Sequence, residues 1–474
     1  MFRRVYDDLL KWKVSDRRRP LLIKGVRQCG KTYIMDEFGR NEYRKMAYFN
    51  FEDTPELSKI FEGQLDPERI IAQLSIAGNV SITPGDTLVV FDEVQVCKRA
   101  LTSLKYFAES SADYHVVCAG SLLGIHHYTK RKQDDGSPSE AFPVGKVQIL
   151  DMFPMDFEEF LLANGEERMV ESLRGHPVGE RVPDYLEPRL RDYLNVFYVV
   201  GGMPDAVNAW ISTHDITEVR RIQSTILETY TDDLDRHPVD SIGTLEKVWN
   251  SVPVQLMKDN TRFIFGQVVK GAKATDLEDA VAWLRDAGLL YCVKVVDNPA
   301  IPISMSETGF YKLYMADIGL FHNRSGVPTS FINTEPEQYK DFKGAMAENY
   351  VLQNLVTRFG RDQHYWRSGA TAEVDFLTEM YYEPIPIEVK SGSAKSSKSL
   401  KVYRSRYEPR VSVKTSMDPD VGGSPVTHIP LYLMWDVGRY VHHMLTETGW
   451  VDPDDHFQSK YSDLGEDRSA EDSE

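Results

Sequence analysis

The chain has few cysteines, no long apolar run and no excess of positive charge. Its four cysteines are far apart in sequence and form no C-x-x-C pair, so neither a zinc knuckle nor a disulfide framework is indicated. No apolar stretch is long enough to cross a bilayer and no signal-peptide core opens the chain, so we expect a cytoplasmic protein without a membrane partner. The formal net charge of −17 argues against a general polyanion binder, although a local basic patch could overcome it.

Beyond these absences, the composition is that of an ordinary globular protein. Of the 474 residues, 42% are hydrophobic and 11% aromatic, which is enough apolar material for sizeable cores. The length suggests about three or four domains. The functions of these domains must be inferred from local motifs.

The strongest local signal is a phosphate-binding pattern near the N-terminus. Residues 25–32, GVRQCGKT, fit the pattern G-x-x-x-x-G-K-[ST] at every fixed position. The apolar run 20–23 precedes them and the helix-like segment 33–38 follows, which is the order of strand, loop and helix that the motif requires. The segment therefore predicts a P-loop that binds ATP.

Each fixed residue of this loop has a physical role. Gly25 and Gly30 allow a backbone that points successive N–H groups at phosphate oxygens. Lys31 would reach the β and γ phosphates, and the Thr32 hydroxyl would ligate Mg²⁺. The other predicted ATP-binding residues of the segment are Arg27, Gln28, Cys29 and Tyr33.

A second motif supports the first. Residues 87–91 form a continuous apolar run, typical of a strand buried on both faces of a parallel sheet, and Asp92 and Glu93 follow directly. In a P-loop enzyme Asp92 would hold the Mg²⁺ shell and Glu93 would polarise the attacking water. A solvated pair of carboxylates is the alternative, but the order and spacing of the two motifs favour a nucleotide site.

Further strands complete the first predicted domain, residues 1–155. Apolar runs at 114–121 and 146–150 indicate strands, and the alternation of strands and helices favours a doubly wound parallel sheet. In P-loop ATPases of the additional-strand class, an extra strand lies between those that carry the two motifs and ends in a polar sensor of the γ-phosphate. Ser121 is placed for that role, and a helix N-cap is an equally good interpretation of this residue.

Two features of this domain stay open. The polar loop 130–138 is either a solvated charge run or a basic loop that touches DNA or a neighbouring subunit's nucleotide. Arg99 and Lys146 are candidates for an arginine-finger role, and the spacing of neither decides the question.

The middle of the chain is largely helical. Residues 156–240 are expected to form a helical lid, with a tight turn at Gly201 and Gly202. Residues 241–330 contain two amphipathic helices followed by an alternating strand, which suggests a winged-helix-like module. Its expected recognition helix, at 276–284, begins with acidic residues, so we prefer a packing or protein-contact role to reading of the DNA major groove.

The segment 331–440 holds a second chemical constellation. Asp375 lies in an alternating strand, and Glu388 and Lys390 lie two residues apart in the next one, which is the spacing of the PD-(D/E)xK nuclease core. Because side chains alternate along a strand, Glu388 and Lys390 project to one side. Glu348, on the preceding helix, can converge there. Asp375 and Glu388 would then bind a divalent metal, while Lys390 orients or deprotonates the nucleophile.

Other interpretations of this set exist. A glutamate and a lysine two residues apart are common by chance, and a fold of this type can keep them as a salt-bridge network without cleavage. Local charge favours DNA, because this region is basic within an acidic chain. Its cations are Lys390, Lys395, Lys398, Lys401, Arg404, Arg406, Arg410 and Lys414. The chain from 441 to 474 turns acidic and reads as a disordered tail.

Taken together, the ordered motifs resemble those of a prokaryotic family of AAA-type ATP-binding proteins that join a P-loop domain to a C-terminal nuclease-like domain of unknown function. The resemblance covers nearly the whole chain. It implies an α/β protein with a P-loop AAA-type ATPase domain, a helical lid, a winged-helix-like module and a restriction-endonuclease-like domain. The motifs that carry it lie at residues 25–32, 91–95, 119–121, 142–146, 201–204, 373–376 and 386–390.

These observations lead to one functional hypothesis and one alternative. The first is an ATPase that uses ATP and Mg²⁺ to control a nuclease-like domain acting on DNA. The second is an ATP-dependent switch that binds a protein partner or associates with itself, and in which the nuclease-like domain serves only for docking.

Overall fold

The chain forms two compact units in a computed structural model. Residues Phe2–Phe153 make up most of one unit, and Pro154–Arg285 together with Leu289–Lys460 make up most of the other. The structure describes residues 1–121, 145–235, 242–258, 261–271, 274–329, 339–369, 372–392, 397–423 and 426–452. The predicted loop 130–138 and most of the predicted acidic tail lie outside these residues. No helix in the described ranges is long and apolar enough to cross a membrane.

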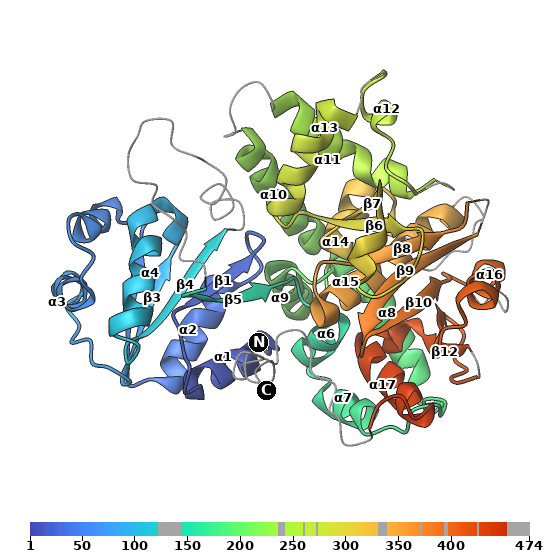
Figure 1. The fold of residues 1–474 in the computed structure, drawn as a ribbon, viewed down its shortest axis with the longest axis horizontal. Coiled ribbons are helices and arrows are strands. Elements are labelled where there is room, and N and C mark those ends of the chain that lie inside the picture. Colours follow the sequence, from blue (N-terminus) through green and yellow to red (C-terminus); the bar gives the residue numbers. More distant parts are fainter. Residues whose placement is uncertain are drawn as a thin grey trace, which may run out of the picture. The chain divides into compact units, whose positions relative to one another are not determined.

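The first unit is built on a parallel sheet of five strands in the order β2-β3-β4-β1-β5 (Figure 1). Its strands are β1 (Leu21–Gly25), β2 (Lys45–Asn50), β3 (Thr87–Asp92), β4 (His115–Ser121) and β5 (Gln148–Met152). Strand β4 lies between β1 and β3, so the predicted additional strand is confirmed. As a result, the carboxyl ends of β1 and β3, which precede the two predicted motifs, meet at one edge of the sheet.

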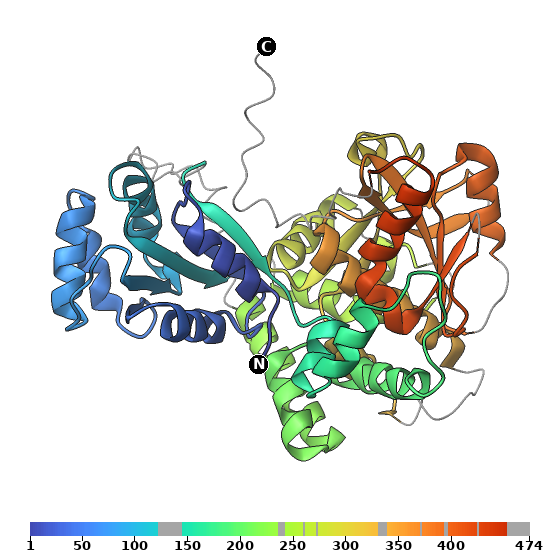
Figure 2. The same ribbon diagram turned by 90° about the horizontal axis from the view of Figure 1, so that it is seen from below.

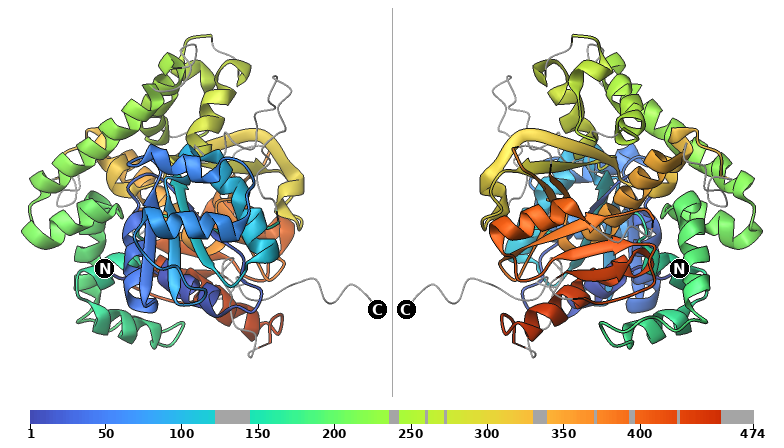
Figure 3. Two further views of the ribbon diagram at one scale, coloured as in Figure 1. Left: turned by 90° about the vertical axis from the view of Figure 1, so that its left-hand side faces the viewer. Right: turned by 90° about the vertical axis from the view of Figure 1, so that its right-hand side faces the viewer.

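Helices cover both faces of this sheet, as expected for a doubly wound fold (Figure 3, left). They are α1 (Val5–Val14), α2 (Lys31–Glu42), α3 (Pro67–Ala77) and α4 (Lys98–Ser110), with the short turns η1 (Pro55–Phe61) and η2 (Val94–Val96). On one face Val89 and Phe91 of β3 share a core with Leu74 of α3 and Leu104 of α4. On the other, Phe38 of α2 packs against Trp12 of α1, with ring centroids 6.5 Å apart. The sheet thus has a separate apolar layer on each face.

The second unit contains a mixed sheet of seven strands in the order β12-β11-β10-β9-β8-β6-β7. Its strands are β6 (Leu290–Val296), β7 (Glu307–Met315), β8 (His364–Arg367), β9 (Glu373–Met380), β10 (Glu383–Val389), β11 (Val413–Ser416) and β12 (Thr427–Pro430). Strand β6 is the predicted alternating strand of the wing, and it pairs with β7. Because β6 pairs in parallel with β8, these strands continue the sheet of the following segment instead of forming a sheet of their own.

Helices make up the rest of the second unit. They are α6 (Phe157–Ala163), α7 (Glu167–Arg174), α8 (Glu187–Val200), α9 (Pro204–Thr213), α10 (Ile216–Asp235), α11 (Ile242–Leu256), α12 (Phe265–Val268), α13 (Ala274–Asp286), α14 (Ile318–Ser325), α15 (Lys340–Phe359), α16 (Lys398–Tyr407) and α17 (Val437–Glu447), with η3 (Ile303–Ser306) and η6 (Leu431–Asp436). The predicted helices of the lid and of the segment 241–330 are present. Figure 3 (right) shows α16 lying over the strands of the second sheet, where Leu400 and Tyr403 pack on Trp366 and Val374.

Helix α17 corrects the prediction that the chain becomes a tail at residue 441. The helix continues through Glu447, and Val441 and Leu445 are fully buried. Arg439 of α17 also donates hydrogen bonds to the carbonyls of Leu173 and His176, so α17 lies beside α7 (Figure 2). Because the segment 441–474 is acidic overall, its sequence did not indicate that its first residues belong to a helix with a buried apolar face.

The turn at Gly201 and Gly202 is a close-packed junction. The Gly202 N–H donates to Oδ2 of Asp317 at 2.6 Å, and a Cβ on Gly202 would lie 2.0 Å from the carbonyl oxygen of Met155. Burial raises the pKa of Asp317 to about 6, although the backbone N–H groups of Gly202 and Leu320 act in the opposite direction. The glycine pair therefore lets three distant segments of the second unit meet without side chains between them.

Candidate functional site

The phosphate loop runs from the end of β1 into the first turn of α2. Gly30, the N-cap of α2, has a φ of +94°, and Gln28 also adopts a positive φ of +63°. No side chain caps α2, so the first N–H groups of this helix are available in the way that anion-binding helix N-termini provide. The backbone at residues 28–30 therefore turns in the way predicted for a phosphate cradle.

Lys31 lies inside this loop. Its side chain is 93% buried, since its exposed fraction is 7%, and its Nζ donates to the carbonyls of Gly25 and Val26 at 3.1 and 2.9 Å. A cation held at the centre of the loop can exchange these carbonyls for phosphate oxygens, which are stronger acceptors. The geometry fits the predicted phosphate contact.

Asp92 lies at the centre of the predicted magnesium site and contacts two hydroxyl groups. Its Oδ2 accepts hydrogen bonds from the hydroxyls of Thr32, at 2.8 Å, and Tyr48, at 2.6 Å. Burial and then this hydrogen bond to Asp92 raise the pKa of Tyr48, so the phenol remains a donor. Thr32 and Asp92, which were predicted to share Mg²⁺, are thus in direct contact. One hydroxyl and one carboxylate suit Mg²⁺, because this ion keeps several waters and binds substrate phosphates.

Glu93 follows β3 in a left-handed conformation, with a φ of +49°. Its carboxylate accepts a hydrogen bond from the side-chain amide of Gln95, which limits its orientation. Ser121 ends β4, and its backbone lies opposite Gly25 of β1. The side chain of Ser121 is outside the described part of the structure, so its role as a sensor stays a prediction.

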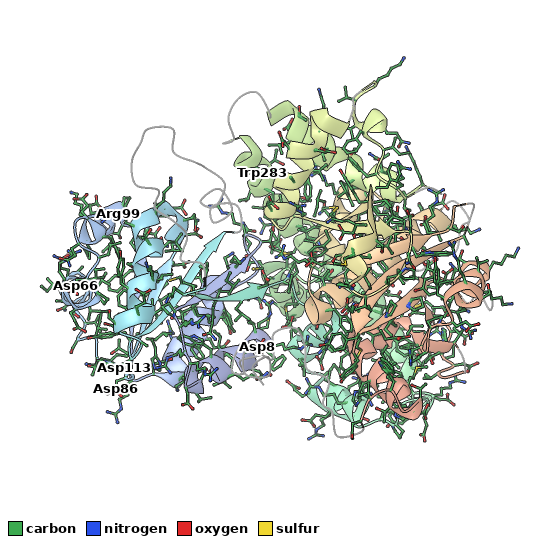
Figure 4. The ribbon with its side chains drawn as sticks, viewed as in Figure 1. Asp8, Asp66, Asp86, Arg99, Asp113 and Trp283 are labelled. Carbon is green, nitrogen blue, oxygen red and sulfur yellow. The ribbon has the colours of Figure 1, made fainter. Side chains whose placement is uncertain are left out.

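Other predicted loop residues have different surroundings. Arg27 forms an ion pair with Glu52 at 3.8 Å, and Tyr33 is half exposed at the start of α2. Of the two finger candidates, Arg99 donates to the carbonyls of Phe61 and Gly63 from helix α4 (Figure 4). Lys146 pairs with Glu109 at 3.1 Å. Through its two hydrogen bonds, Arg99 helps to fix the end of η1 within the first unit.

Arg3 and Cys29 tie the phosphate loop to the end of the first unit. The guanidinium of Arg3, only 4% exposed, donates to the carbonyl of Cys29 at 2.8 Å and to that of Phe153 at 2.6 Å. The Cys29 thiol faces the carbonyl of Met152 at 3.8 Å. Cys29 is thus a structural member of the loop, and the loop is braced against the last residues before the chain leaves this unit.

The second predicted centre lies where β9 and β10 diverge. The backbone N–H of Val389 donates to Oδ2 of Asp375 at 2.7 Å, and Lys390 forms an ion pair with Glu388 at 2.6 Å. Burial, followed by the like charges of Glu348 and Glu388, raises the pKa of Asp375 well above its usual range. The four residues predicted from the sequence are therefore brought together.

Strand β7 adds two residues that sequence reasoning missed. Lys312, only 1% exposed, pairs with Glu373 at 2.7 Å and with Glu348 at 3.8 Å, and the Tyr314 hydroxyl donates to Glu348 at 2.6 Å. Burial alone would lower the pKa of Lys312, but the carboxylates of Glu348 and then Glu373 outweigh it and raise the pKa above its usual range. A lysine and a tyrosine two residues apart in an amphipathic strand were the available signal, but their partners lie more than 30 residues away in sequence.

We expect replacement of Lys312 by methionine to destabilise the second unit by about 3–5 kcal/mol, because Glu348 and Glu373 would lose their buried counter-ion. Chemical denaturation of the purified protein measures this change. The matched control is Lys401→Met on the exposed surface of α16, for which we expect a change within about 0.5 kcal/mol. Equal stability of the two variants would contradict the assignment of Lys312 as a buried counter-ion.

A divalent cation at the second centre would need oxygen ligands from its carboxylates. Within the described ranges, no group of three or more His, Cys, Asp and Glu side chains is arranged to hold a metal ion. Glu388 is 3% exposed, and its Oε2 has no hydrogen-bond partner among the described residues. Asp375 and Glu388 thus fit a site of the magnesium type, in which one or two carboxylates act together with water and substrate phosphate.

Comparisons with known proteins agree with the first centre. Residues 17–161 match a family model described as an AAA domain. Residues 191–330 and 343–432 match two domains of unknown function, DUF8612 and DUF4143. A search of curated proteins finds no match.

Several solved structures are distantly similar. The Walker-type ATPase PABY2304 of Pyrococcus abyssi is 15% identical with a TM-score of 0.39, covering 68% of this chain and 96% of that one. The Orc1 protein of Aeropyrum pernix in complex with DNA is 12% identical with a TM-score of 0.26, covering 70% and 92%. The Pif1 helicase from Candida albicans is 12% identical with a TM-score of 0.22, covering 40% and 47%. Similarity at these scores is too distant to define a ligand or an activity.

The match to the AAA domain and the geometry of the phosphate loop define the class of the first unit. It carries a P-loop ATPase-like domain of the AAA type.

Proposed function

We propose that this protein is an ATPase whose nucleotide state controls a nuclease-like centre acting on DNA. The observation that carries the ATPase half is the direct contact of Thr32 with Asp92, next to a loop in which Lys31 is buried. These are the groups that position and neutralise a nucleoside triphosphate.

The proposed roles follow from the contacts. Lys31 would exchange its carbonyl partners for the β and γ phosphates, and Thr32 and Asp92 would hold Mg²⁺, which shields phosphate charge when bound. Tyr48 keeps the Asp92 carboxylate oriented. Glu93, fixed by Gln95, orients the attacking water.

The nuclease half is supported by the order of elements in the second unit. Helix α15 is followed by the antiparallel strands β8, β9 and β10, then by α16 and by β11, which runs parallel to β10. This order resembles the nuclease core suggested by the motif, and it puts Asp375, Glu388 and Lys390 at one end of neighbouring strands. A fold alone does not fix an activity, so the proposal rests on these side chains.

The chemistry proposed for this centre is metal-assisted hydrolysis of a phosphodiester. Asp375 and Glu388 would hold the cation, which lowers the pKa of bound water and neutralises the scissile phosphate. Lys390, whose partly exposed side chain reaches Glu388, orients the water or stabilises the leaving group. Lys312 and Tyr314 fix Glu348 beside them.

A second candidate function is favoured by one observation. Lys312 and Lys390 already pair with carboxylates of this centre, as expected if the fold keeps these residues as a structural salt-bridge network. The protein would then be an ATP-dependent switch in which the second unit binds a protein partner.

Incubation of purified protein with plasmid and linear DNA tests the proposal. Mg²⁺ or Mn²⁺ is supplied, with or without ATP, and a chelator serves as the control. We expect cleavage that requires the metal and changes with ATP. Metal-dependent ATP hydrolysis without DNA cleavage under any condition would favour the switch, and absence of both activities would contradict the proposed function.

A further inference from the structure

Strand β7 is an edge strand of the second sheet, and it carries an exposed aromatic ring with an arginine stacked on it. Phe310 is 49% exposed, although a phenylalanine in a sheet is normally buried. The guanidinium of Arg262 lies 3.1 Å from the centroid of its ring. The segment that carries Arg262 is held against the other side of β7 by its next residue, Phe263. The rings of Phe263 and Tyr311 stack there with centroids 6.0 Å apart.

This pair lies close to residues of the second centre. Arg262, which is stacked on Phe310, interacts electrostatically with Tyr365 of β8. The ammonium of Lys312 lies 4.9 Å from the centroid of the Tyr365 ring, and Arg367, two residues after Tyr365, is paired across the strands with Glu373. Tyr365 therefore lies between the Phe310–Arg262 pair and Lys312, which pairs with Glu373 and Glu348.

Arg262 and Arg367 supply positive charge near Phe310. Partial burial lowers the pKa of Arg262, the interaction with Tyr365 acts in the opposite direction, and the like charge of Arg367 adds a smaller lowering effect. Two guanidinium groups close enough to repel one another are stabilised by an anion placed between or beside them. A phosphate is such an anion.

The opposite side of the centre is also cationic. Lys414 of β11 is the register partner of Glu388, and Lys390 lies next to it along β10. In the order β9-β8-β6-β7, three strand spacings separate the strand of Phe310 from the strand of Asp375, which corresponds to ~14 Å. Positive groups thus lie on both sides of the carboxylates Asp375 and Glu388. The exposed ring of Phe310 lies only on the β7 side.

We propose that Phe310 and Arg262 form a stacking platform for an unpaired base, so that the substrate of the second centre is single-stranded nucleic acid or a duplex with a single-stranded end. An exposed ring offers stacking to any base, and the flanking arginines hold the backbone. Bases inside a continuous duplex are already stacked on one another and cannot use the ring. This inference rests on the proposed function, because it names the substrate class of that centre.

Binding of fluorescently labelled DNA to the full chain tests the platform without requiring cleavage. Anisotropy is measured with a single-stranded oligonucleotide and with the blunt duplex of the same sequence, in Ca²⁺ or without metal. Phe310→Ala is expected to weaken single-strand binding by ~5- to 150-fold, the range found for loss of one stacked base. Phe310→Tyr should retain binding, and duplex affinity should change little in either variant.

Tyr382 provides a matched control. It is also an exposed aromatic residue, 76% accessible, but it lies in the turn between β9 and β10, at the other end of these strands from Asp375 and Glu388. Tyr382→Ala should leave single-strand affinity unchanged. An equal effect of the Phe310 and Tyr382 substitutions, or no effect of Phe310→Ala, would overturn the platform.

The outcomes separate this inference from the proposed function. Single-strand binding that depends on Phe310, without cleavage by the wild-type protein, would support the platform and count against the nuclease. Metal-dependent cleavage of blunt duplex that is unchanged in Phe310→Ala would support the nuclease and refute the platform.

Discussion

Replacement of Lys31 by alanine is expected to reduce ATP hydrolysis by at least ~100-fold, a loss typical of removing a charge-stabilising group from a transition state. The Nζ of Lys31 is the buried cation at the centre of the phosphate loop, where it contacts the carbonyls of Gly25 and Val26. Without it, the loop has no ammonium to place against the β and γ phosphates. Release of phosphate from ATP measures turnover, and a fluorescent nucleotide analogue measures binding.

Two further variants make this result specific. Glu93→Gln keeps the shape of its side chain and leaves Lys31, Thr32 and Asp92 in place, so nucleotide binding should persist while hydrolysis falls by ~10²–10⁴-fold, as on loss of a catalytic base. Lys45→Ala removes an exposed lysine at the start of β2 and should change neither quantity. Binding that survives in Lys31→Ala, or hydrolysis that survives in Glu93→Gln, would remove the corresponding residue from the proposed mechanism.

The elements around both centres could be predicted because their signals are local. The apolar run that ends in Asp92 identifies a buried parallel strand, and the glycines of the phosphate loop permit the positive φ found at Gly30. The alternation around Asp375 and Glu388 likewise identified two strands, and the structure pairs these strands in antiparallel fashion. Patterns of this kind depend on neighbouring residues and require no knowledge of tertiary packing.

Contacts between distant segments could not be predicted in the same way. The parallel pairing of β6 with β8 joins residues about 70 positions apart, and no alternation pattern specifies which strand lies next to which. Lys312 looked like an ordinary polar residue of an amphipathic strand until its partners on α15 and β9 were known. Arg3 gave no signal at all, because its acceptors are backbone carbonyls that any residue could supply.

The second large effect is expected at the other centre. Lys390→Ala should reduce metal-dependent DNA cleavage by ~10²–10⁴-fold, the usual contribution of a group that assists proton transfer in the transition state. Because Lys390 also pairs with the buried carboxylate of Glu388, its loss could lower stability as well. Cleavage must therefore be measured together with thermal unfolding of each variant.

Asp375→Asn resolves this ambiguity. An asparagine oxygen can still accept the hydrogen bond from the Val389 N–H, so the end of β10 keeps its place, while the negative charge that a cation needs is lost. Burial and the charges of Glu348 and Glu388 already raise the pKa of Asp375, so a neutral side chain there relieves repulsion and should not destabilise the fold. Loss of cleavage with unchanged unfolding would make Asp375 a ligand of the catalytic metal. Full cleavage by both Asp375→Asn and Lys390→Ala, with Lys247→Ala on the exposed surface of α11 as the control, would mean that this centre does not cut DNA and that its lysines and carboxylates serve the fold.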